Sequence, residues 1–175
     1  MKIIPLGIQG DYVIKYELIE DERGFFARMW DKETLETNGL NGNFVQSNMS
    51  FSWKTGTFRG FHYQVAPYQE NKLVTCFKGS AIDYILDLRP NSPTYKQLES
   101  VEIGMLTKKA VYVPEGCGHG FITLVDDTRL IYWTTRKYNK ESERGVRWND
   151  PILKELIVKP EVISGKDSTW GDYDG

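Results

Sequence analysis

The sequence predicts an all-β protein, a barrel or a sandwich, because turn signals, aromatic residues and alternating patterns occur along most of the chain. Glycine is frequent, with 16 residues, and the 5 Trp, 10 Tyr and 8 Phe residues favour strands. In the run 81–88, Ile82, Tyr84 and Leu86 alternate with Asp83 and Asp87, as expected when the two faces of a strand meet different environments. Many short strands between tight turns are typical of barrels and sandwiches.

Nine runs are expected to form strands, and one polar stretch is expected to form a short helix. The helix covers residues 31–37, where Asp31 can cap its amino end. The mixed segment from Pro151 onward is expected to pack across the barrel. The expected strands are 11–19, 43–51, 57–63, 72–77, 81–88, 98–102, 110–113, 118–124 and 129–135.

Length and charge restrict the classes of function. A chain of 175 residues suits one domain, 1–175, and leaves no room for a second catalytic domain. The net charge of −2 provides no field that would attract nucleic acid or anionic lipid, so neither is expected as a partner. No apolar run reaches the roughly 20 residues that span a bilayer, and no signal-peptide core is evident, so a cytoplasmic protein is expected. Cys76 and Cys117 are expected to be buried, inert thiols.

Both histidines lie in motifs flanked by glycine. His62 lies in FRGFHYQ (58–64) and His119 in PEGCGHGF (114–121). The second motif has the Pro-x-Gly-x-x-His pattern of the second cupin box, and the first resembles a first cupin box without its metal ligands. This resemblance implies a double-stranded β-helix, or cupin jelly-roll barrel, with a few short peripheral helices. Gln64 stands where a metal site would have another histidine, and two histidines cannot complete such a ligand set, so no metal site is expected.

Further motifs resemble the dTDP-4-dehydrorhamnose 3,5-epimerase family and follow its order from about residue 21 to residue 167. The resemblance implies a nucleotide-sugar substrate, no metal or redox cofactor, and a homodimer in which amino-terminal strands cross to the neighbouring site. The motifs are DERGFF (21–26), QSNMS (46–50), RGFHYQ (59–64), KLV (72–74), SPTY (92–95), GHGF (118–121) and WNDP (148–151).

Epimerisation beside a ketone needs a base, a group that stabilises the enolate oxygen, and an acid on the opposite face of the ring. His62 suits the base, because imidazole titrates near neutrality. Lys72 suits the enolate oxygen, since an ammonium compensates developing negative charge. Tyr132 suits the acid, because its phenol is neutral at physiological pH. The family resemblance supports these assignments and pairs His62 with Asp167, which would fix the histidine tautomer.

The resemblance also implies a set of binding residues. Cations would meet the diphosphate, and Tyr138 could stack on the base or the sugar. Arg28 stands where dTDP-sugar enzymes of the family often have a glutamate that contacts the nucleotide, so GDP- and CDP-linked sugars stay open beside dTDP-linked ones. The expected binding residues are Arg23, Gln46, Asn48, Arg59, His119, Tyr138, Glu143 and Lys166.

Strand parity offers an internal test of these assignments. Alternate residues of the expected strands, such as Gln46 and Asn48, can face one interior. Arg59 and His62, however, differ by three positions and would point to opposite faces of a regular strand. A bulge or bend near Gly60 is therefore predicted.

The favoured function is epimerisation at C3, C5 or both of a nucleotide-linked 4-keto-6-deoxyhexose or a related ketosugar such as a heptose. A single-centre epimerase or a 3,4-ketoisomerase on the same barrel is the nearest alternative. A non-catalytic sugar-binding cupin is an alternative of a different class. A metal-dependent cupin oxygenase is disfavoured by the missing ligands.

Overall fold

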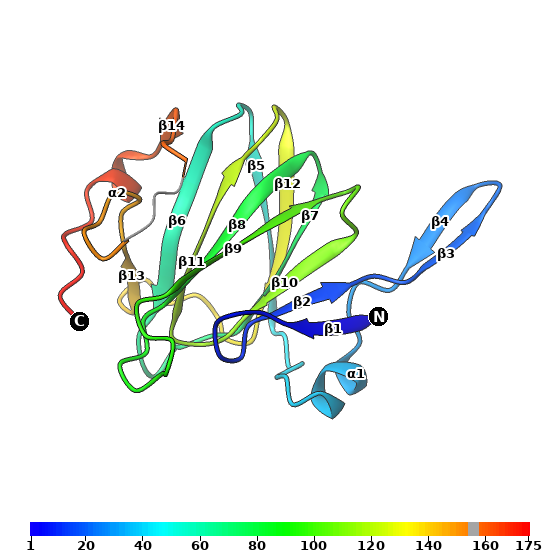
Figure 1. The fold of residues 1–175 in the computed structure, drawn as a ribbon, viewed down its shortest axis with the longest axis horizontal. Coiled ribbons are helices and arrows are strands. Elements are labelled where there is room, and N and C mark those ends of the chain that lie inside the picture. The colour runs from blue at the N-terminus through cyan, green and yellow to red at the C-terminus, as the bar shows by residue number, and fades with distance from the viewer. Residues whose placement is uncertain (154–157) are drawn as a thin grey trace.

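Two sheets built mainly of antiparallel strands face each other in the computed structural model, which describes residues 1–153 and 158–175 (Figure 1). The predicted cupin jelly-roll fold is confirmed. The first sheet has the order β1 (Lys2–Pro5), β2 (Tyr12–Lys15), β10 (Lys109–Val113), β7 (Lys72–Lys78), β12 (Thr128–Thr134) and β5 (Gln46–Ser52). The second has the order β13 (Glu143–Gly145), β6 (Thr57–Gln64), β11 (Cys117–Thr123), β8 (Ser80–Asp87) and β9 (Leu98–Gly104), and β14 (Val162–Ile163) pairs with β6 in parallel.

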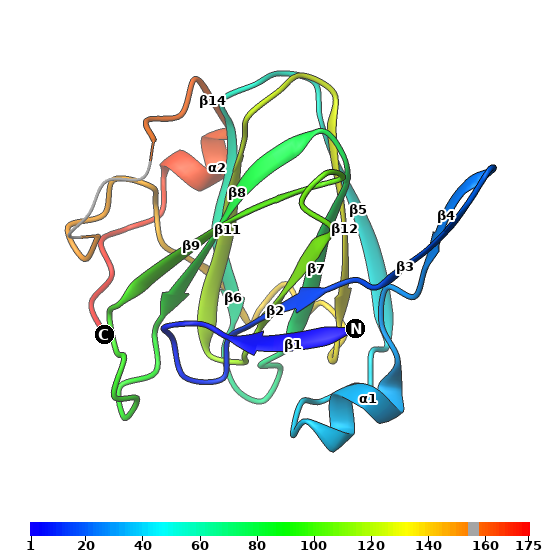
Figure 2. The ribbon, with the colours of Figure 1, turned by 45° about the vertical axis from the view of Figure 1, so that its right-hand side comes forward.

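The amino-terminal strand prediction is wrong in one respect. The run 11–19 is not one strand, because the chain leaves the first sheet after β2 and enters a separate hairpin of β3 (Leu18–Asp21) and β4 (Gly24–Ala27). This hairpin projects away from the barrel (Figures 1 and 2). Its apolar side chains are exposed, with Ile19 at 69%, Phe25 at 52% and Phe26 at 63% of their full area.

Two short helices lie at the periphery of the barrel. Helix α1 (Lys32–Thr37) begins where the sequence predicts, because the Asp31 carboxylate accepts a hydrogen bond from the Thr34 backbone N–H at 2.9 Å. Leu35 of α1 is fully buried against the outer face of the first sheet, beside Leu73 and Tyr112. Helix α2 (Gly165–Ser168) follows β14 and is capped by Ser164.

The carboxyl-terminal segment packs against the outer face of the second sheet. Ile152, Leu153, Ile163 and Tyr173 contact a cluster that contains the buried Phe61. The expectation that this segment crosses the barrel is confirmed for the described part, and residues 154–157 lie outside it. Within the described residues, no helix is long and apolar enough to cross a membrane.

One large apolar cluster fills part of the barrel interior. Val74 and Ile85, from opposite sheets, are fully buried in the same cluster. Cys76 and Cys117 belong to this cluster as free thiols, as predicted. Burial raises the pKa of Cys76 to about 11 and that of Cys117 to about 12.

The bulge predicted near Gly60 is confirmed by the pairing of β6 with β11. His62 pairs with His119, but Arg59 pairs with Phe121, so β6 contains one residue more than β11 over this interval. Gly60 has a φ of 137°, which favours glycine. A Cβ at this position would also lie 2.9 Å from the His119 carbonyl oxygen and closer still to the Gly120 Cα.

Replacing Gly60 with alanine should therefore lower the free energy of unfolding by about 2–4 kcal/mol, since it adds backbone strain and a clash with β11. Gly171→Ala is the matched control, because a Cβ there meets nothing within 4 Å, and it should change stability by less than about 0.5 kcal/mol. Denaturant titration of both variants measures the difference. Equal stabilities would contradict the described packing.

Candidate active site

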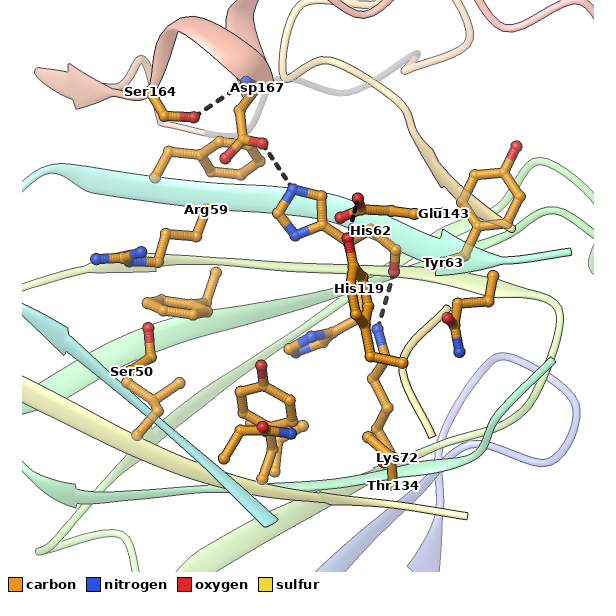
Figure 3. A pocket seen from close by; sticks show the side chains of 18 of the residues that line it. Ser50, Arg59, His62, Tyr63, Lys72, His119, Thr134, Glu143, Ser164 and Asp167 are labelled. Carbon is orange, nitrogen blue, oxygen red and sulfur yellow. Dashed lines mark hydrogen bonds and ion pairs between the residues drawn. The ribbon is translucent and has the colours of Figure 1, made fainter. Parts of the chain in front are cut away.

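A cavity of about 570 Å³ opens between the two sheets, and most of the predicted site residues line it (Figure 3). Strands β5, β7 and β12 form one wall, and β6 and β11 form the other. The predicted residues that line the cavity are Gln46, Asn48, Arg59, His62, Lys72, His119, Tyr132, Tyr138, Glu143 and Asp167. Arg23 and Lys166 are not among the lining residues.

Strand parity and the bulge determine which side chains enter the cavity. On β5, Gln46, Asn48 and Ser50 line it, while Met49 between them is 67% exposed on the outside. The bulge turns both Arg59 and His62 toward the cavity, although they are three residues apart. The predicted arrangement of faces is therefore confirmed.

His62 and Asp167 form a hydrogen-bonded pair, with 2.6 Å between Nε2 and Oδ1 (Figure 3). Burial by itself would raise the pKa of Asp167. The hydrogen bond and charge of His62 oppose it, together with bonds from the Gly60 backbone and the Ser164 side chain, and the pKa ends below its ordinary value. The carboxylate is therefore ionised at neutral pH and can orient the imidazole, which is one-third exposed to the cavity.

Lys72 at the start of β7 is buried, with only 7% of its area exposed. Its ammonium donates a hydrogen bond to the backbone carbonyl of His62 at 3.0 Å and lies 3.4 Å from a Glu70 carboxylate oxygen. A buried ammonium needs such partners, because desolvation disfavours an unpaired charge. Lys72 is thus fixed within the same cavity as the His62 imidazole rather than solvated on a strand surface.

Tyr132 lies on β12, so it faces the cavity from the sheet opposite His62. Burial raises the pKa of its phenol, and the Glu70 and Glu143 carboxylates add to the increase, while Arg59 reduces it. The phenol is therefore protonated at neutral pH and can donate a proton.

His119 is paired differently from His62. Its Nε2 lies 2.8 Å from Oδ2 of Asp83, which is fully buried on β8. Among the described residues, no group of three or more His, Cys, Asp or Glu side chains is arranged to hold a metal ion. Each imidazole instead contacts one carboxylate.

The mouth of the cavity is polar. Tyr138 donates its hydroxyl hydrogen to Glu143 at 2.9 Å, and its backbone N–H bonds the Gln46 side chain at 3.0 Å. Lys166 contacts Glu143 at 2.6 Å, so it lies at the rim although it does not line the cavity. Arg59 donates to the Phe51 carbonyl at 2.9 Å. Tyr138, Glu143 and Lys166 thus form one connected polar group near Gln46, at the start of β5, whereas Arg59 lies near Phe51 at its end.

Comparison with known proteins identifies the family. The family described as dTDP-4-dehydrorhamnose 3,5-epimerase matches residues 5–174. The chain belongs to the dTDP-4-dehydrorhamnose 3,5-epimerase family. The enzyme of that name from Shigella flexneri is 36% identical over 169 residues, covering 95% of this chain and 93% of the relative.

Two further members of the epimerase family bear on its chemistry. A crystal structure of the dTDP-4-dehydrorhamnose 3,5-epimerase from Bacillus anthracis, with TDP and PPi bound, superposes with a TM-score of 0.94 at 35% identity and covers 98% of this chain and 99% of its own. A dTDP-4-dehydrorhamnose 3-epimerase from Streptomyces niveus is 36% identical over 154 residues, covering 87% of this chain and 74% of the relative. The family therefore includes relatives named for one centre and for two.

Arg23 lies away from the cavity of this epimerase-family chain. It lies at the tip of the β3–β4 hairpin, outside the cavity of its own chain, where it pairs with Asp21 at 2.5 Å. Its side chain is 83% exposed. A single chain therefore does not bring Arg23 to the other predicted site residues.

Sequence reasoning missed one cavity residue and the partner of another. Glu70 lies in the loop before β7, where no motif singled it out. Asp83, which does not line the cavity but pairs with His119, was interpreted only as part of an alternating strand. Asp83 could have been found from the sequence, because β8 and β11 are both expected strands and a buried histidine needs a polar partner. No sequence signal identified Glu70, because its position depends on the path of a loop.

Proposed function

We propose that the chain epimerises C3 and C5 of a nucleotide-linked 4-keto-6-deoxyhexose by removing and returning protons beside the ketone. The observation that carries this proposal is the placement of an imidazole and a phenol on opposite walls of one cavity that also holds a buried ammonium. Family membership favours epimerisation over a 3,4-ketoisomerase or a non-catalytic sugar-binding cupin.

His62 acts as the base in this proposal. The neutral imidazole takes a proton from the carbon beside the ketone, and the resulting imidazolium is stabilised by the ionised Asp167 carboxylate at 2.6 Å. Because His62 is partly exposed, the abstracted proton can exchange with water. Hydrogen from the solvent would then appear in the sugar.

Lys72 stabilises the enolate. Removal of the proton moves negative charge onto the ketone oxygen, and an ammonium already held in a buried position compensates that charge without first having to reorganise. Tyr132 then returns a proton from the opposite face of the ring. The phenol proton bonds to the carbon through the electron pair of the enolate C=C bond, and the oxygen lone pair re-forms the C=O bond. A phenolate remains on Tyr132, which regains a proton from solvent while the His62 imidazolium releases its proton to solvent.

The polar mouth supports binding of the nucleotide diphosphate. Arg59 and Lys166 supply positive charge, Tyr138 offers an aromatic face, and Gln46 and Asn48 offer amide groups. We propose a dTDP-linked sugar, because the relatives are named for dTDP sugars. Arg28 stands where dTDP-sugar enzymes of the family often have a glutamate, and its guanidinium lies 3.8 Å from the Asp31 carboxylate. The identity of the nucleotide base is therefore tested directly below.

We further propose that the chain works as a homodimer in which the β3–β4 hairpin of each subunit completes the neighbour's site. The projection of this hairpin and the exposure of Ile19, Phe25 and Phe26 support the arrangement, since a second subunit would cover these apolar side chains. Arg23 would then reach a diphosphate bound to the partner.

Incubation of the protein with dTDP-, GDP- and CDP-linked 4-keto-6-deoxyhexoses in deuterated water tests the function. We expect deuterium at C3 and C5 of the dTDP sugar, read by NMR. His62→Ala should reduce incorporation by at least about a hundredfold, because the base is lost, while nucleotide affinity stays close to that of the unaltered protein. Tight binding without label at any carbon would favour the sugar-binding alternative, and label at C3 alone would indicate a single-centre epimerase.

Tyr132→Phe should separate the two halves of the reaction. Proton removal by His62 does not need the phenol, so solvent exchange should fall by less than about tenfold, whereas net inversion should fall by about a hundredfold or more. Both rates can be followed in one NMR sample. Equal losses would assign the phenol a different role.

Mixing two variants tests the exchange of hairpins between subunits. Arg23→Ala should raise KM about tenfold through loss of a charged contact, and His62→Ala should be inactive. A dimer formed from one chain of each contains one intact site, so refolding the two together should recover activity at low substrate concentration. A mixture of His62→Ala with Lys72→Ala is the control, because both residues line the cavity of their own chain and no intact site can form. Recovery in neither mixture would argue against a shared site.

A further inference from the structure

Glu70 is one of three carboxylates that line the cavity, together with Glu143 and Asp167. It precedes β7 and lines the cavity, and only 8% of its side chain is exposed. One oxygen lies 3.4 Å from the Lys72 ammonium, and the other accepts a hydrogen bond from the Gln64 side-chain amide. Both carboxylate oxygens are therefore engaged by the protein.

Gln64 is itself firmly placed, which fixes the position of Glu70. The side-chain oxygen Oε1 of Gln64 accepts a hydrogen bond from the Asn139 backbone N–H at 2.6 Å. Its amide nitrogen also donates to the backbone carbonyl of Tyr68 at 3.0 Å. These bonds connect the end of β6 to the loop that contains Glu70 and to the loop between β12 and β13, so the carboxylate is held against Lys72 rather than being free to turn toward a ligand.

The second anchor of Lys72 is the His62 carbonyl, 3.0 Å from the ammonium nitrogen. Glu70 and this carbonyl hold the ammonium at two points. If either contact were removed, the four-carbon side chain of Lys72 could adopt other rotamers. A displacement of a catalytic group by about 1 Å can lower the rate about a hundredfold. Glu70 thus acts on the geometry of the group that is proposed to meet the enolate.

Glu70 also acts on Tyr132 through its charge. After burial, the Glu70 carboxylate is the largest influence that raises the pKa of the Tyr132 phenol. Arg59 on β6 lowers the pKa of the phenol, and Glu143 on β13 raises it less than Glu70 does. Among the other titratable side chains that line the same cavity are His62, Lys72, His119 and Asp167. Glu143 is bonded to both Lys166 and Tyr138, and Glu70 is likewise paired with Lys72, so each carboxylate acts on the phenol with part of its charge compensated.

We propose that Glu70 is a positioning residue that fixes the Lys72 ammonium beside the His62 carbonyl. Its charge, in the cavity that Tyr132 also lines, adds to the effect of burial in keeping the phenol neutral. This inference rests on the proposed function. Glu70 neither gains nor loses a proton in the reaction and does not touch the reacting atoms. Its negative charge disfavours a phenolate nearby, and Lys72 shields the carboxylate from the enolate.

The ratio of net inversion to solvent exchange isolates the step that uses Tyr132, because His62 and Lys72 affect both rates. In the unaltered protein this ratio should fall as the pH rises through the raised pKa of Tyr132, since the phenolate has no proton to donate. Glu70→Gln preserves the shape of the side chain but removes the charge. It should move the fall in the ratio to lower pH.

Three further variants keep the test decisive. Glu70→Asp retains the charge and should restore the original pH profile, and Glu141→Gln removes the same charge from an exposed side chain and should leave it unchanged. Glu70→Ala removes both anchor and charge and should lower the exchange rate about tenfold or more at an almost unchanged KM. Nucleotide binding by each variant confirms that it has folded.

An identical ratio profile in Glu70→Gln and the unaltered protein would overturn the inference while leaving the proposed function intact. A rise in KM without loss of exchange in Glu70→Ala would also overturn it, because Glu70 would then serve binding. Absence of exchange in the unaltered protein would instead remove the proposed function, and this inference with it.

Discussion

The close approach of β6 and β11 at Gly60 and Gly120 is the constraint on which the rest of the site depends. A regular strand would send Arg59 and His62 to opposite faces, but the extra residue in β6 turns both inward. His62 then meets Asp167, and its carbonyl meets Lys72. A glycine is needed at position 60 because any Cβ would collide with the neighbouring strand.

Paired local charges, rather than net charge, determine the electrostatics of the cavity. The whole chain carries a formal charge of −2, yet several charged groups inside the cavity have an oppositely charged partner. Lys72 faces Glu70, and His62 faces Asp167. Such pairs allow one cavity to contain a potential base, a cation and a neutral phenol close together, because each partner favours a particular protonation state. A nucleotide sugar bound there would therefore meet local electrostatic fields that differ from one part of the ligand to the next.

Local sequence signals predicted the parts of the fold that obey a simple period. The strands of the barrel, the cap at Asp31 and the bulge near Gly60 follow from alternation, side-chain chemistry and a conflict of parity. The β3–β4 hairpin was missed because run 11–19 is continuous in propensity, and only pairing shows that the chain leaves the sheet. Glu70 was missed because a loop brings it to Lys72, and loop paths depend on tertiary contacts rather than on period. The functional roles rest on the resemblance to the family, while the structure adds which side chains share one cavity.

The two cysteines have a practical consequence for measuring the opening of this barrel. Cys76 lies on β7 and Cys117 on β11, in the interior cluster, and both thiols resist ionisation because they are buried. Since the thiolate is the reactive form, alkylating reagents should meet little reactive sulfur until the two sheets separate. The native chain thus carries two intrinsic reporters of large-scale opening, placed on opposite walls, that need no engineered label.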